Sequence, residues 1–192
     1  LDTQGNTLAV QNLVATVPDF QWQPKLSLEA VLSGEAKDYL SVLRQAPLPS
    51  EFAATLKRLE ATGLLTVPLS IELALDGDQA PQVKGQVQVS GGTLSLGKEF
   101  PPLENIRGAI DFSMQQLRTE SLRVQFLGGE SVLSGGWGEA AQRLQAQGTV
   151  SVVGLSQLLG TQAALPLTGQ ARYDAQLVPT KQKGYEATLT ST

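Results

Sequence analysis

The strongest constraint on this chain is an alternation of apolar and polar residues that recurs along most of its length. Successive side chains of a β-strand point to opposite faces of the sheet, so a period of two predicts strands with one apolar face and one wet face. The alternating runs cover residues 67–75, 83–89, 106–114, 122–126, 144–152 and 165–177, and further strands are expected near 7–17 and 25–32. Parallel strands are usually apolar on both faces, so the pattern predicts a mainly β, antiparallel fold of about a dozen strands.

Turns and helices interrupt the alternation in a few places. The turn signals are Asp76-Gly77-Asp78, Gly91-Gly92, Pro101-Pro102 and Gly128-Gly129. Apolar residues at helical spacing predict a two-helix insert over about 35–62, in which Ser50 caps the second helix and Gly63 follows its end. A shorter helical turn is expected over about 155–160. The insert would either plug the mouth of a groove or cover an exposed edge of the sheet, and we favour the edge.

The strands and helices repeat, which predicts that residues 1–192 form one continuous segment rather than separate domains. A strand, a helix and an alternating strand follow one another first near 25–76 and again near 143–177. Glycine also recurs on the apolar face of the strands, at Gly85, Gly108, Gly148 and Gly169. Such glycines either permit curvature or a bulge, which we favour, or leave room for a guest above the face.

The composition excludes several classes of function. The chain has no His and no Cys, so Ser-His-Asp and Cys-His catalysis and the commonest zinc ligands are absent. We therefore expect a protein that is not an enzyme, with no catalytic residues, no metal site and no cofactor. The net charge is −4 and the basic residues are scattered, which argues against a nucleic-acid partner. A carbohydrate-binding domain would need aromatic platforms, and the chain offers little beyond Trp22 and Trp137.

The apolar face leaves two interpretations open. In a closed β-sandwich, the faces of two sheets would bury each other, and the domain would serve structure or protein interaction. In an open, curved sheet, the apolar side would face a ligand, since an uncovered apolar surface of this size otherwise promotes aggregation. Alternation alone favours the sandwich.

Several motifs resemble a known family. Residues Leu103-Glu104-Asn105-Ile106-Arg107-Gly108-Ala109-Ile110-Asp111-Phe112, followed by Leu122 and Leu127-Gly128-Gly129, resemble a repeat of the AsmA-like proteins, most closely their large YhdP-type members, which are related to TamB. Further matches are Tyr39-Leu40 with Pro47-Leu48-Pro49, Leu59-Glu60-Ala61-Thr62-Gly63, Pro68-Leu69-Ser70-Ile71-Glu72-Leu73 and Leu167-Thr168-Gly169-Gln170-Ala171-Arg172-Tyr173. Their order and spacing over 35–190 are more specific than any one of them.

The resemblance implies a bridge-like lipid transfer protein of the Gram-negative periplasm, anchored in the inner membrane. Its long, curved and open sheet, a β-taco, would form a groove that conducts phospholipid acyl chains between the inner and outer membranes. The two ends of the full-length protein would contact these membranes. No apolar run in this chain approaches the roughly 20 residues that span a bilayer, and the chain stops on strand-like residues, so we expect a mid-chain piece of that groove. The residues expected to line the groove are Leu69, Ile71, Leu73, Val83, Val87, Val89, Leu94, Leu96, Ile106, Ile110, Phe112, Leu122, Val124, Phe126, Leu144, Val150, Val152, Leu167, Tyr173 and Leu177.

Overall fold

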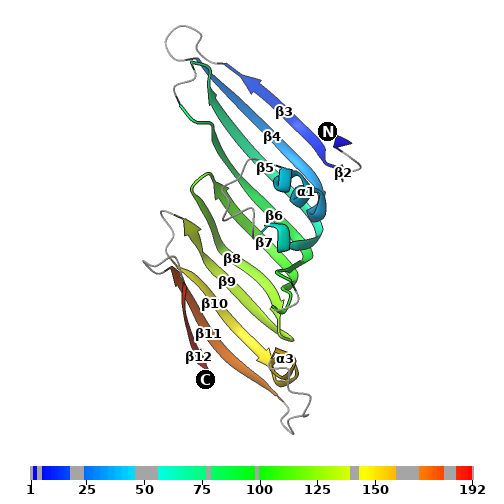
Figure 1. Cartoon of the computed structure of the whole chain (residues 1–192), viewed down its shortest axis with the longest axis vertical. Coiled ribbons are helices and arrows are strands. Elements are labelled where there is room, and N and C mark those ends of the chain that lie inside the picture. The colour runs from blue at the N-terminus through cyan, green and yellow to red at the C-terminus, as the bar shows by residue number, and fades with distance from the viewer. Residues whose placement is uncertain are drawn as a thin grey trace.

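The computed structural model of the chain contains one long antiparallel sheet (Figure 1). It describes residues 2–3, 6–17, 24–45, 56–76, 79–97, 100–138, 143–158, 169–179 and 185–191. The strands are β1 (Asp2–Thr3), β2 (Asn6–Thr7), β3 (Ala9–Thr16), β4 (Lys25–Glu35), β5 (Glu60–Ala74), β6 (Gln82–Ser95), β7 (Glu104–Ser113), β8 (Gln116–Phe126), β9 (Gly129–Gly138), β10 (Leu144–Ser151), β11 (Gln170–Pro179) and β12 (Tyr185–Ser191). The helices are α1 (Ala36–Gln45) and α3 (Val152–Leu158).

The sheet is open, and it follows the chain order. Ten strands pair in the order β12-β11-β10-β9-β8-β7-β6-β5-β4-β3, while β1 and β2 form a small pair of their own. Every pairing is antiparallel, and β3 and β12 lie at the two edges without pairing with each other. The mainly β, antiparallel prediction is therefore confirmed. The closed sandwich that alternation alone favours is wrong for the described residues, because all their long strands lie in this one sheet.

Short turns make this order possible. Phe126 pairs with Gly129, which leaves a turn of only two residues between β8 and β9. Both of these residues, Leu127 (φ 50°) and Gly128 (φ 75°), have positive φ. Two consecutive positive φ angles are the mark of a type I′ turn, whose twist matches that of an antiparallel hairpin. The predicted turn at this position is thus confirmed.

The helical insert differs in detail from the prediction. The first helix, α1, spans Ala36–Gln45, and residues 56–58 are helical again, while the predicted cap Ser50 lies outside the described residues. Strand β5 already begins at Glu60, so the predicted helix end at 62 is wrong. Gly63 therefore does not terminate a helix. It lies within β5 at φ 104° and faces Gly92 of β6, where an added Cβ would collide with the carbonyl oxygen of Gly91.

The second predicted repeat of strand, helix and strand, near 143–177, has different boundaries in the structure. Helix α3 begins at Val152, where the alternation predicts that the strand continues, and β11 begins only at Gln170. The expected strand residues 165–168, including Leu167, lie outside the described residues. The backbone hydrogen bond from Val152 to the carbonyl oxygen of Gly169 still joins the start of α3 to the start of β11.

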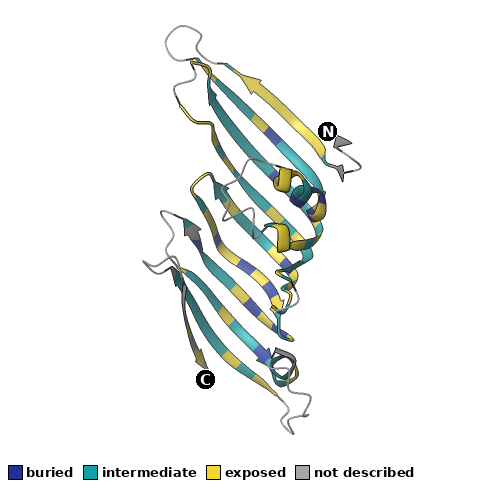
Figure 2. Ribbon diagram, viewed as in Figure 1, coloured by how far each residue is buried: buried dark blue, intermediate teal, exposed yellow. Residues whose placement is uncertain are grey.

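The core of this fold is thin. Ile106, Leu122 and Val124 form a buried cluster on β7 and β8, with Val89, Leu94, Leu103, Ile110, Phe126 and Leu133 packed against it. Among the described residues, no side chain is less than 2% exposed. A sheet with a second layer would bury its apolar face more completely. Figure 2 shows the same result as strands that are mostly intermediate in burial, with few buried positions.

An uncovered apolar sheet face as the candidate functional site

Strand register gathers the apolar positions onto one face. Across β4, β5, β6 and β7 the opposed residues include Leu28–Ile71–Val83, Ala30–Leu69–Gly85–Phe112, Leu65–Val89–Gly108 and Val87–Ile110. Across β8 to β11 they include Leu122–Leu133–Ala146–Ala175 and Leu144–Leu177. Directly opposed residues point to the same face of a sheet. One apolar stripe therefore runs in the hydrogen-bonding direction from β4 to β11.

Most of the predicted lining residues occupy this face. Those within the described strands are Leu69, Ile71, Leu73, Val83, Val87, Val89, Leu94, Ile106, Ile110, Phe112, Leu122, Val124, Phe126, Leu144, Val150, Tyr173 and Leu177. Three others differ: Leu96 is exposed beyond the end of β6, Val152 belongs to α3, and Leu167 is not described. The prediction is wrong for Leu96 and Val152 because the alternation of apolar and polar residues continues past the ends of the paired strands β6 and β10. The same face also includes Leu26, Leu28, Ala30 and Leu32 of β4, which the prediction missed although apolar residues alternate there as well.

Two glycines of the face are covered by aromatic rings of the neighbouring strand. A Cβ added at Gly85 would lie 2.6 Å from Cζ of Phe112, so this ring fills the space above the glycine. Gly148 pairs with both Ser131 and Tyr173, and the hydroxyls of Tyr173 and Ser131 share a hydrogen bond at 2.8 Å. The Tyr173 side chain must therefore span Gly148. At these two positions, glycine makes room for a side chain of the protein itself.

Helix α1 covers one part of the face. It contacts β4 and β5, and the buried positions of these strands are Ala30 and Val67, both on the apolar side. From α1, Ala36, Asp38 and Leu40 are buried. The predicted role as an edge cover is wrong for α1, because β4 and β5 are interior strands and β3 lies outside them. The helix instead occupies the apolar face.

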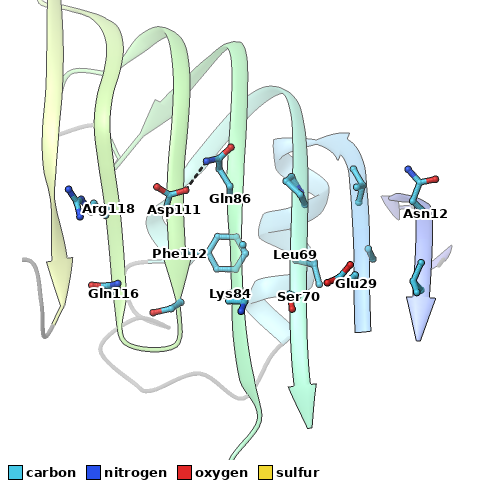
Figure 3. A pocket seen from close by; sticks show the side chains of 16 residues that line it. Asn12, Glu29, Leu69, Ser70, Lys84, Gln86, Asp111, Phe112, Gln116 and Arg118 are labelled. Carbon is cyan, nitrogen blue, oxygen red and sulfur yellow. Dashed lines mark hydrogen bonds between the residues drawn. The ribbon is translucent and has the colours of Figure 1, made fainter. Parts of the chain in front are cut away.

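The opposite face is polar and hydrogen-bonded. Gln86 Nε2 donates to Asp111 Oδ1 at 2.8 Å, and Gln147 Nε2 donates to Asp174 Oδ2 at 2.7 Å. A shallow hollow of about 970 Å³ opens on this side of the sheet (Figure 3). Its lining combines charged and amide residues, such as Lys84, Gln86, Asp111 and Arg118, with apolar ones such as Val31, Pro68 and Leu69. Its charged and amide groups suit water rather than an acyl chain. The two faces of the sheet therefore differ sharply in polarity.

No chemistry beyond this polarity emerges from the described residues. In the part of the chain that the structure describes, no three Asp, Glu, His or Cys residues come together as a metal site would require. None of the described helices is long and apolar enough to cross a membrane.

Comparison with known proteins identifies a family and one relative of this chain. The family model described as "YhdP protein" matches residues 2–192. The intermembrane phospholipid transporter YhdP of Escherichia coli (strain K12) is 28% identical over 111 residues, which are 58% of this chain and 9% of that protein. The chain thus aligns with less than a tenth of this relative's length, and no solved structure matches. Since the family model covers almost all of its residues, the chain belongs to the YhdP family.

Proposed function

We propose that this chain is one continuous segment of a hydrophobic groove that conducts phospholipid acyl chains between the inner and outer membranes. The observation that carries the proposal is the apolar stripe from β4 to β11, which has no second sheet above it among the described residues. The groove lining would be the predicted set within these strands, extended by Leu26, Leu28, Ala30 and Leu32 of β4.

The size of the stripe supports movement along it rather than fixed binding. The strands from β4 to β11, spaced about 4.8 Å apart, extend about 34 Å in the hydrogen-bonding direction. The hydrocarbon core of a bilayer is about 30 Å thick, so each acyl chain spans about 15 Å of it. The stripe is therefore longer than its cargo, and a chain could occupy several successive positions on it.

The energetics fit the same role. Each CH₂ removed from water contributes about 0.8 kcal/mol, so two acyl chains are held firmly without any directional contact. An aliphatic lining offers similar contacts at each step, which lets a lipid slide without leaving a deep local site. The headgroup would remain in water at the open side of the groove.

Family membership supports a proposal about the cellular compartment of the full-length protein. The relative's name describes transport of phospholipid between membranes. We propose that the full-length protein lies in the periplasm of a Gram-negative bacterium, is anchored in the inner membrane and carries lipid without catalysing a reaction. The mixed, hydrogen-bonded outer face is compatible with an aqueous compartment.

Adjacent residues of one strand provide the test. Val87 faces Ile110 on the apolar side, whereas Gln88 faces Ala109 on the polar side. A photoreactive benzoylphenylalanine placed at each position in turn, in cells that carry the protein in their membranes, reports what lies against each face. We expect phospholipid adducts, identified by mass spectrometry, at Val87 and not at Gln88. Equal labelling at both positions, or none at Val87, would refute the proposal.

A further inference from the structure

We infer that α1 is a displaceable strap that competes with acyl chains for the apolar face of β4 and β5. This inference rests on the proposed function and adds a moving part to it. Its first support is position: α1 contacts two interior strands, on the side where Ala30 and Val67 are buried. Figure 3 looks onto the polar hollow, and there the helix lies behind the sheet. Helix and lipid would therefore occupy the same surface.

The N-terminal end of the helix is joined directly to the sheet. Its first residue, Ala36, follows directly on Glu35, the last residue of β4, so the chain itself holds this end against the sheet. Ala36, Asp38 and Leu40 are buried. Val42 and Leu43, near the other end, are exposed. The buried contact thus lies mostly in the first half of α1.

The C-terminal end of α1 is held by two hydrogen bonds of Arg44, which we call the clasp. Arg44 donates from Nε to the carbonyl oxygen of Leu56 at 3.0 Å and from Nη2 to that of Leu59 at 2.6 Å. These carbonyls lie in and just after the helical residues 56–58, before β5 begins. Both hydrogen bonds are exposed to solvent, where water can replace them. The clasp can therefore open without leaving a buried group unpaired.

The helix has little intrinsic stability to hold it in place. It has only ten residues, and isolated helices shorter than about 12–15 residues are marginal in water. The Tyr39 hydroxyl is buried and has no hydrogen-bond partner among the described residues, a cost that lifting the helix would remove. An acyl chain on this part of the face would cover apolar surface of β4 and β5 that α1 covers now.

The chain has no cysteine, so single-cysteine variants can follow the strap and the cargo separately. L40C reports the buried side of α1, where Leu40 is 8% exposed. L144C reports the apolar face away from the helix, because Leu144 is half-buried on β10 and a lipid above it would cover the thiol. L43C is the control, because Leu43 is already 43% exposed, and A36C provides a second buried position on α1 in case L40C folds poorly. The rate of reaction with a maleimide is measured with and without vesicles of phosphatidylethanolamine and phosphatidylglycerol.

Lipid should change the maleimide labelling rates of L144C and L40C in opposite directions. With vesicles present, we expect the L144C thiol to react more slowly, the L40C thiol to react about tenfold faster, and the L43C thiol to change little. In the R44A background, the L40C thiol should react faster even without lipid. Slower labelling of L144C with unchanged or slower labelling of L40C and A36C would overturn the strap and leave the proposed function standing. Unchanged labelling of L144C would contradict the proposed function and the strap with it.

Discussion

A charge placed at Ile110 separates a lipid-facing surface from an ordinary core. Ile110 is half-buried on the apolar face, its strand neighbour Ala109 points to the polar face, and Val124 lies at the centre of the buried cluster with 3% exposure. I110D, A109D and V124D therefore introduce the same carboxylate into three different surroundings. If the apolar face were a closed core, I110D and V124D should lose similar amounts of unfolding free energy. If the face is uncovered, I110D should lose much less than V124D.

The expected loss of unfolding free energy depends on how far each substituted side chain is buried. Fully burying an Ile side chain contributes about 1.5–3 kcal/mol, so losing the half-buried Ile110 should cost about 1–1.5 kcal/mol of unfolding free energy. For a chain of this length that lowers Tm by roughly 2–6 °C. An unpaired carboxylate at Val124 should cost about 3–5 kcal/mol, a large part of a typical domain's stability. A109D should stay within about 0.5 kcal/mol of the parent chain.

Lipid binding should rank the variants differently. In the lipid-bound state, the carboxylate of I110D would be covered by acyl chains, where an unpaired charge costs several kcal/mol. We expect I110D to weaken binding of a fluorescent phospholipid by at least about a hundredfold, while A109D binds as the parent does. Urea unfolding gives the stability, and fluorescence titration gives the affinity. The reasoning fails if I110D unfolds like V124D, or if it folds and binds lipid like A109D.

Three further predictions concern side chains of the apolar face and of α1. G85A places a Cβ 2.6 Å from both the Phe112 ring and the backbone carbonyl oxygen of Pro68, so urea unfolding should show a loss of about 1–2 kcal/mol. F112L should restore only the part that comes from the ring, and a neutral G85A would contradict the observed packing. Y173F removes the hydrogen bond to the nearly fully buried Ser131 and should destabilise the chain by about 1–2 kcal/mol, whereas unchanged stability would show that the bond does not form. Y39F should be neutral or stabilising, because the Tyr39 hydroxyl is buried without a partner among the described residues; a loss of stability would reveal a partner. Burial also raises the pKa of Tyr39 above its ordinary value, so the folded state favours the neutral phenol; stability should be lost above about pH 10 in the parent chain and less in Y39F, as alkaline unfolding can measure.

The strands could be predicted because their signal is local. Alternation depends on neighbouring residues alone, and the β5, β6, β7 and β8 faces follow it as expected. The errors occurred where local signals conflict with pairing. Gly63 looks like a helix terminator in the sequence, but its place opposite Gly92 shows that β5 has already begun. Val152 continues the alternation, but no strand is paired with it among the described residues, and the backbone turns into α3 instead.

The sequence by itself determined that this chain forms antiparallel strands with one apolar and one polar face, and that it lacks His and Cys chemistry. Whether that apolar face is covered was decided only by the tertiary structure. A sandwich and an open sheet require the same alternation, since both place every second side chain on an apolar surface. The difference lies in pairing between residues far apart in the chain: β3 and β12 remain edges, and α1 rather than a second sheet lies on the face of β4 and β5. Such pairings depend on how the whole sheet assembles, which no local pattern records.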